Sequence, residues 1–139
     1  MAFTVQRHID WGDCDAAGIV FYPNYFRWMD SAFHQVCAAA GYDQRALREQ
    51  FGELGTPLLD AQASFQAPGT YGDSLEVDVR VEDWGRSSFR VTYSIMRDTM
   101  VLVIGTEKRV FVETGNAGTL KACPIPDEFR RKIEELVGE

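Results

Sequence analysis

One stretch of sequence, residues 13–25, reads DCDAAGIVFYPNY and decides both the fold and the candidate site. Its two carboxylates, Asp13 and Asp15, precede an apolar run and then Pro23, which suits the first turn of a helix because its missing N–H costs nothing there. A helix N-terminus favours negative charge through its unpaired N–H groups and the positive end of its dipole. The stretch therefore combines a base with an anion receptor, as acyl-transfer chemistry requires.

The segment that starts at Pro23 is expected to form a long helix. Apolar side chains recur there at steps of three and four residues, and Gly41 is a natural stop. The apolar positions are Tyr25, Trp28, Met29, Ala32, Phe33, Val36, Cys37 and Ala40. Phe26 widens this stripe, so the helix is apolar around much of its circumference and we expect a sheet to wrap it. The aromatic residues of the stripe are interpreted as core rather than as a ligand site.

Alternating apolar residues predict strands before and after this helix. Residues 3–11 form the first expected strand and place Trp11 on its apolar face. Residues 75–84 and 89–95 alternate cleanly and are close enough to form a hairpin. The remaining expected strands are 57–65, 100–112 and 120–123, the last after a turn at 115–118.

Two short helices complete the expected fold. Asp43 is a suitable cap for a polar helix through about Gln50, and Pro126 opens a small amphipathic helix. The strand over 57–65 has a mixed pattern and is predicted to be mostly buried. The order of elements predicts an α+β fold with one long central helix packed on a curved antiparallel sheet. A length of 139 residues predicts a single domain, 1–139, with a core of its own.

Composition excludes several classes of protein. The chain is 45% hydrophobic and 25% charged, as ordinary globular proteins are. No apolar run is long enough for a membrane span, and the first residues lack the features of a signal peptide, so we expect a cytoplasmic protein without a membrane partner. A net charge of −7 argues against a nucleic-acid partner but leaves an anionic small molecule open. Three cysteines without C-x-x-C spacing disfavour disulfides and a metal site.

Residues 12–25, followed by Arg27, Trp28, Met29 and Asp30, resemble the signature of the 4-hydroxybenzoyl-CoA thioesterase family of hotdog-fold proteins. The 55–57 step and the 84–89 hairpin resemble that family too, and the likeness runs from about residue 5 to residue 112. The resemblance implies a hotdog fold and a homo-oligomer, in which dimers join their sheets and often pair as dimers of dimers. It further implies active sites at the dimer interface and hydrolysis of acyl-CoA thioesters. No cofactor is expected, because CoA is part of the substrate.

The resemblance also implies roles for particular residues. The family's catalytic aspartate corresponds to Asp15, and the backbone N–H that polarises the thioester carbonyl corresponds to that of Tyr22. Substrate-binding positions correspond to Asp30 and Thr56. The expected CoA-binding residues are those of the hairpin, Arg86, Ser87 and Ser88. The chain departs from the family at Ala16, where proline is frequent, and in having a single arginine in its hairpin.

The chemistry is compatible with these residues. A thiol pKa near 8.5 means that the leaving thiolate needs little help from a general acid. Asp15 either attacks the carbonyl, giving a mixed anhydride, or acts as general base to water. For Asp13 the preferred interpretation is a loop-turn residue. The carboxylates on either side of Cys14 disfavour its thiolate, so a nucleophilic Cys14 is not expected.

Two of the remaining polar candidates, Asp30 and the 86–88 hairpin, keep two interpretations, whereas each histidine has one preferred interpretation. Asp30 is either a charge at an exposed edge or subunit contact, paired with Arg27, or a contact for the acyl group. His34 is interpreted as a partly buried histidine rather than a base, and His8 as a surface residue. The 86–88 hairpin tip has the composition of a solvated turn as well as that of a phosphate site.

The expected function is that of an acyl-CoA thioesterase, with aromatic acyl groups such as 4-hydroxybenzoyl favoured. One alternative is a thioesterase for short aliphatic acyl-CoA or acyl-carrier-protein thioesters. Another is a hotdog module that binds acyl thioesters without hydrolysing them.

Overall fold

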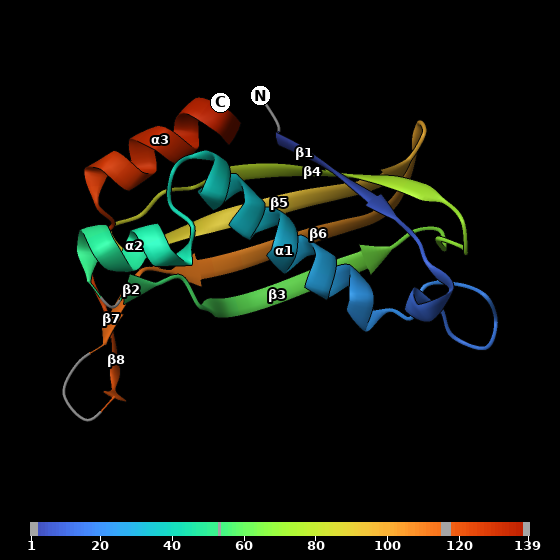
Figure 1. Cartoon of the computed structure of the whole chain (residues 1–139), viewed down its shortest axis with the longest axis horizontal. Helices are drawn as coiled ribbons and strands as arrows, with labels where there is room; N and C mark the ends of the chain where they lie inside the picture. The colour runs from blue at the N-terminus through green and yellow to red at the C-terminus, as the bar shows by residue number, and fades with distance from the viewer. Residues whose placement is uncertain (1–2, 53, 115–117, 138–139) are drawn as a thin grey trace.

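A curved antiparallel sheet wraps one long helix in this computed structural model, which describes residues 3–52, 54–114 and 118–137 (Figure 1). The elements in chain order are β1 (Phe3–His8), the 3-10 helix η1 (Trp11–Asp13), α1 (Pro23–Ala39), α2 (Gln44–Phe51), β2 (Leu54–Gly55), β3 (Leu58–Phe65), β4 (Ser74–Glu82), β5 (Ser88–Arg97), β6 (Met100–Val110), β7 (Val112–Thr114), β8 (Leu120–Ala122) and α3 (Asp127–Val137). This is the predicted α+β layout.

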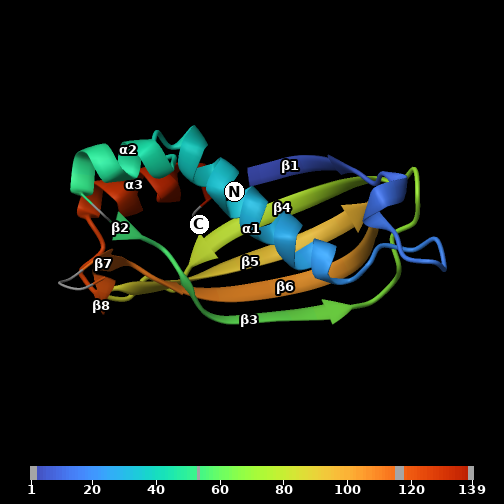
Figure 2. The same cartoon turned by 60° about the horizontal axis from the view of Figure 1, so that its bottom comes forward.

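The main sheet has the strand order β1-β4-β5-β6-β3, and a small second sheet has the order β2-β7-β8. Figure 2 shows α1 lying across one face of the main sheet, with β1 and β3 at its two edges. The helices α2 and α3 and the small sheet gather at one end of the molecule. The loop that carries η1 and enters α1 lies at the other end. The two ends therefore have different structures, and β3 runs from the first to the second.

The sequence pattern of α1 accounts for its position. All eight residues of the apolar stripe are buried, and the helix ends before Gly41, whose φ of +91° suits glycine. The facing strands β4 and β5 alternate as predicted, with inward residues such as Val77 and Val79 no more than 1% exposed. Burying one such side chain stabilises the fold by about 1.5–3 kcal/mol. Residues of α1, β4 and β5 make up most of the hydrophobic core.

Three predictions about strands were wrong in detail. Trp11 lies in η1 and is 62% exposed, because β1 ends at His8 and the alternation no longer applies there. The segment 57–65 is exposed rather than mostly buried, since β3 is an edge strand that pairs only with β6. The expected strand 100–112 divides at Phe111 into β6 and β7, which belong to different sheets.

Other sequence predictions of local structure are confirmed. Asp43 caps α2 by accepting a hydrogen bond from the Ala46 N–H at 2.8 Å. The inward side of α3 is buried at Phe129, Ile133 and Val137. His8 is exposed, as predicted. The turn predicted at 115–118 falls mainly on residues 115–117, which lie outside the described part of the chain.

Gly105 allows α1 to approach the sheet closely. A Cβ at this position would lie 2.2 Å from Sδ of Met29, whose side chain is completely buried. We predict that Gly105→Ala lowers the free energy of unfolding by about 1–3 kcal/mol, because the added methyl overpacks the helix–sheet contact. Urea denaturation measures the effect. The matched control is Gly12→Ala, where a Cβ meets no atom within 4 Å; equal stability losses for the two variants would contradict the prediction.

Candidate active site

Residues 13–21 form a tight loop that leads directly into α1. Cys14 and Val20 make an isolated antiparallel bridge, and the Phe21 N–H donates to the Asp13 carbonyl at 2.9 Å. Within the loop, the Asp15 N–H donates to the Ile19 carbonyl at 2.9 Å. Backbone hydrogen bonds therefore hold Asp15 on a loop whose second arm continues into Tyr22.

The Asp15 carboxylate is only partly engaged. Its Oδ1 accepts the Ala17 N–H at 2.9 Å, a short-range turn of the kind that aspartate favours. Within the described residues, Oδ2 has no hydrogen-bond partner, and the side chain is half-buried. One oxygen is thus fixed by the loop while the other is available to a substrate or a water.

The backbone N–H of Tyr22 is an unused donor at the start of α1. The neighbouring N–H of Asn24 donates to the Phe21 carbonyl at 2.9 Å, and Pro23 has no N–H. No acceptor among the described residues bonds the Tyr22 N–H. A free donor at a helix N-terminus, aided by the helix dipole, is suited to stabilising a developing oxyanion.

Asp13 has a structural role, as its preferred interpretation predicted. Its carboxylate is buried, accepts the Asp10 N–H at 2.9 Å and lies 3.5 Å from Arg27. Asp13 lies in η1, and its carboxylate contacts Asp10 and Arg27 rather than the Asp15 loop. For Cys14, burial and then the charges of Asp13 and Asp15 raise the pKa of the thiol, which agrees with the expectation that Cys14 is not a nucleophile.

The β3–β4 loop holds the Asp15 loop in place. The Val20 N–H donates to the Gly69 carbonyl and the Gly69 N–H donates to the Tyr25 hydroxyl, both at 2.9 Å. Thr70 bridges to Ile19, and Asp73 accepts from both the N–H and the hydroxyl of Thr70 at 3.0 Å. The chain entering the site is therefore clamped from the side of the sheet.

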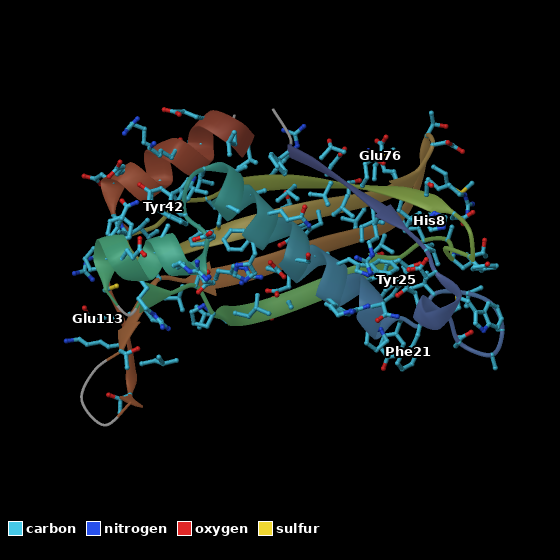
Figure 3. The ribbon with its side chains drawn as sticks, viewed as in Figure 1. His8, Phe21, Tyr25, Tyr42, Glu76 and Glu113 are labelled. Atoms are coloured by element: carbon cyan, nitrogen blue, oxygen red, sulfur yellow. The ribbon has the colours of Figure 1, made fainter. Side chains whose placement is uncertain are left out.

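An apolar pocket of about 370 Å³ opens beside this loop. Its walls are Ile19, Val20, Tyr22, Tyr25, Phe65 and residues 66–68. Tyr22 and Phe65 are exposed and make an edge-to-face contact with ring centroids 6.4 Å apart. Figure 3 shows Phe21 and Tyr25 at this end of the molecule, where α1 begins. The pocket adjoins the free Tyr22 N–H and has room for an apolar or aromatic group.

A second pocket, of about 520 Å³, lies near the other end of β3. Asp30, His34, Gln44, Thr56, Leu58 and Arg109 are among its lining residues. Asp30 does not pair with Arg27; its Oδ1 accepts from Nη2 of the buried Arg109 at 2.8 Å. The structure thus brings two predicted substrate-binding residues, Asp30 and Thr56, into one pocket.

Arg109 belongs to a buried polar network beneath this pocket. Its Nε donates to Glu107 at 3.0 Å and its Nη1 to the Thr56 carbonyl at 2.9 Å, while its guanidinium lies 4.4 Å from the Phe33 ring centroid. The Tyr93 hydroxyl also donates to Glu107. Burial alone would lower the pKa of Arg109, but the adjacent carboxylates of Glu107 and then Asp30 keep it above its ordinary value.

This network was not predicted from the sequence, although the sequence carries a signal for it. Glu107 and Arg109 are two residues apart on β6 and so lie on the same side of the strand as the buried Gly105. Charged residues at inward positions mark a buried ion pair, because an unpaired buried charge is costly. The alternation of Gly105, Glu107 and Arg109 along β6 is the sequence signal that indicates the buried network.

The hairpin residues Arg86, Ser87 and Ser88 lie apart from Asp15. The carbonyls of Arg86 and Ser87 accept from Ile125 and Phe111 at 2.9 and 2.7 Å, which ties the hairpin to the C-terminal segment. Figure 1 places this connection at the α3 end, away from the Asp15 loop. The exposed Arg86 side chain pairs with no carboxylate of the described residues. Within one chain, the predicted residues therefore form three groups: one at the Asp15 loop, one in the Asp30 pocket and one at the hairpin.

The chain is similar in sequence to known proteins. The family model described as the thioesterase-like superfamily matches residues 9–133. The chain belongs to this superfamily. The 4-hydroxybenzoyl-CoA thioesterase of Pseudomonas sp. (strain CBS-3) is 33% identical over 134 residues, covering 92% of this chain and 94% of that protein. A 1,4-dihydroxy-2-naphthoyl-CoA hydrolase of Synechococcus elongatus is 27% identical over 128 residues, covering 92% of each chain.

Solved structures agree. The Pseudomonas enzyme has a TM-score of 0.87 to this chain at 33% identity, with 94% of this chain and 98% of that chain covered. A mutant of it, complexed with 4-hydroxybenzoyl-CoA, has a TM-score of 0.88 at 32% identity, with 95% and 98% covered. A gentisyl-coenzyme A thioesterase has a TM-score of 0.81 at 32% identity, with 92% and 99% covered. The predicted resemblance, the hotdog fold and the class of thioester hydrolase are confirmed.

In the residues that the structure describes, no three His, Cys, Asp or Glu side chains group closely enough to hold a metal ion. Across the same residues, no helix has the length and apolar character needed to cross a membrane.

We predict that Asp73 stabilises the β3–β4 loop in a pH-dependent way. Although burial would raise its pKa, hydrogen bonds from Thr70 and Arg97 lower it below the ordinary value of 3.8. The folded state therefore binds fewer protons, and the stabilisation is present above the unfolded-state pKa and lost as pH falls through the folded-state pKa. Asp73→Asn should reduce the free energy of unfolding by roughly 1–3 kcal/mol at pH 7.

Urea titrations of both proteins from pH 7 to pH 3 measure this difference. It should shrink steadily below about pH 4, as the wild-type carboxyl takes up its proton. A difference that stays constant over the whole range would show that the charge of Asp73 contributes nothing.

Proposed function

We propose that this protein hydrolyses aromatic acyl-CoA thioesters, with hydroxylated aryl groups such as 4-hydroxybenzoyl favoured, to the free acid and CoA. The observation that carries the proposal is the free Tyr22 N–H at the start of α1, on the same loop as the half-engaged Asp15 carboxylate. The adjoining apolar pocket provides space for the acyl group. The named substrates of the related enzymes, all hydroxyaryl-CoA thioesters, support the same class.

In the proposed reaction, the thioester carbonyl oxygen accepts the Tyr22 N–H. Charge that develops on this oxygen is stabilised by the donor and by the helix dipole; one well-aimed donor of this kind contributes roughly 3–4 kcal/mol. Asp15 then acts in one of two ways. As nucleophile it forms a mixed anhydride and expels CoA thiolate, and water hydrolyses the anhydride; as general base it takes a proton from the attacking water. Neither route needs a metal or cofactor, since the thiolate leaves readily.

The active form is proposed to be a homodimer joined through β3. This strand presents eight residues at a free sheet edge, with Leu58, Leu59 and Phe65 between 46% and 60% exposed. Long apolar edges of this kind are normally covered in native proteins. Antiparallel pairing with β3 of a second copy would extend the sheet across a two-fold axis. Further pairing of such dimers into a tetramer is part of the proposal.

This dimer would bring together two groups of site residues, the one at the Asp15 loop and the one in the Asp30 pocket. Antiparallel pairing brings the Leu58 end of one β3 to the Phe65 end of the other. The pocket at Tyr22 and Phe65 of one copy would then adjoin the pocket at Asp30 and Thr56 of its partner. The proposed site thus takes Asp15 and Tyr22 from one protomer and Asp30 and Thr56 from the other. Arg86, Ser87 and Ser88 remain the proposed contacts for the CoA phosphates.

We predict that Asp15→Asn, a nearly isosteric change, lowers kcat by roughly 100-fold or more, because it removes either the nucleophile or the base. Affinity for a non-hydrolysable thioester analogue should stay near the wild-type value. The measurement is thiol release from benzoyl, hydroxybenzoyl, phenylacetyl and short aliphatic CoA esters, with analogue binding followed by calorimetry.

The same panel separates the competing functions. Fast release from aliphatic esters alone would favour a short-chain thioesterase. Tight analogue binding without release from any ester would indicate a binding module. Unchanged turnover in Asp15→Asn would rule out the role given to Asp15.

A subunit-mixing experiment tests the composite site. Asp15→Asn and Asp30→Leu should each be nearly inactive with hydroxybenzoyl-CoA, because each damages both sites of its homodimer. After joint unfolding and refolding, half of the dimers are mixed and each carries one intact site. About one quarter of wild-type activity should return. Activity equal to the sum of the separately refolded variants would show that the four residues act within one chain.

A further inference from the structure

His34 lies one helical turn after Asp30 on α1, and both side chains line the 520 Å³ pocket. His34 Nε2 is 3.5 Å from Asp30 Oδ1, and the two side chains are 37% and 51% exposed. This contact is an ion-pair distance and not a hydrogen bond. His34 was predicted to be a partly buried histidine rather than a base, and in the described residues its ring has no hydrogen-bond partner.

Arg109 determines which part of Asp30 is available. Nη2 of Arg109 holds Oδ1 at 2.8 Å, whereas no described residue bonds Oδ2. Arg109 is itself balanced by Glu107, and both are about 2% exposed, so neither offers a free charge to the pocket. The pocket therefore presents one carboxylate oxygen and, beside it, an imidazole, neither of which is hydrogen-bonded by a described residue.

The orientation of His34 is restricted. Its ring packs edge-on against Phe33, with centroids 5.5 Å apart, and Phe33 is fully buried under the Arg109 guanidinium. The imidazole is thereby supported on its inner side and open on the side that faces the pocket. A polar ligand atom at Asp30 Oδ2 would lie within reach of His34 as well.

We propose that His34 is a specificity-determining residue that, together with Asp30, recognises a hydroxyl group on the acyl ring. The hydroxyl donates its proton to Asp30 Oδ2 and accepts a hydrogen bond from the His34 N–H. A hydroxyl satisfies both partners because it is donor and acceptor at once. An amino group on a ring serves only as a donor, and a methoxy group only as an acceptor, so each leaves one pocket group unpaired. This inference rests on the proposed function and names its substrate more narrowly.

The test compares kcat/KM for 4-hydroxybenzoyl-, 4-aminobenzoyl-, 4-methoxybenzoyl- and benzoyl-CoA in wild-type protein and in His34→Ala. The variant should lose roughly 5- to 20-fold in kcat/KM for the hydroxyl ester, while benzoyl-CoA changes less than about 2-fold. The preference for hydroxyl over amino should largely disappear. Gln35→Ala is the matched control, because Gln35 is the exposed neighbour on α1 and lies outside the pocket.

The outcomes separate this inference from the function on which it rests. An equal loss with benzoyl-CoA would show that His34 only supports the fold, and an unchanged hydroxyl preference would show that it does not contact the ring; either result overturns the inference while Asp15-dependent turnover stands. If the wild-type protein hydrolyses no ester, the proposed function fails. The dissociation constants of non-hydrolysable hydroxybenzoyl and benzoyl analogues then decide: a hydroxyl preference that His34→Ala abolishes supports the inference, and one that it leaves intact overturns it.

Discussion

The buried guanidinium of Arg109 is the constraint on which the rest of the structure depends. It bonds Asp30 on α1, Glu107 on its own strand and the carbonyl of Thr56, so one side chain connects the helix, the sheet and the link to β3. A buried charge is tolerated only when it is paired and its N–H groups are bonded. The network therefore specifies how α1 sits on the sheet, and with it the positions of the residues at both pockets.

The helix α1 also explains why the candidate site is divided. The free Tyr22 N–H lies at its N-terminus, and Asp30 and His34 follow about two and three turns later. A helix rises 1.5 Å per residue, so these groups are about 12 Å or more apart along one chain. A small acyl group bound to one chain therefore cannot contact both the Tyr22 N–H and the pocket at Asp30. In the proposed dimer, pairing at the exposed edge of β3 would place these unlike ends next to each other.

The sequence was most informative where a local rule operates. The three- and four-residue spacing after Pro23 predicted α1, and the alternation of Val77 and Val79 predicted β4, because both patterns reflect burial on one face. The loop from Asp13 to Tyr22 was recognisable for a similar reason: a carboxylate, a glycine at positive φ and a helix start are all local features. Trp11 was misplaced because alternation has no meaning once a strand has ended.

The sequence by itself therefore determined the long helix, the strand segments that precede and follow it along the chain, the hotdog resemblance and the loop that presents Asp15. Only the tertiary structure decided that β3 is an exposed edge, that Asp30 pairs with Arg109 rather than Arg27, and that Asp30 shares a pocket with Thr56 and His34. The reason is physical. Periodicity records which side of an element is buried, whereas strand order and ion pairing are set by contacts between residues far apart in the chain, such as Asp30 and Arg109, which no local pattern encodes.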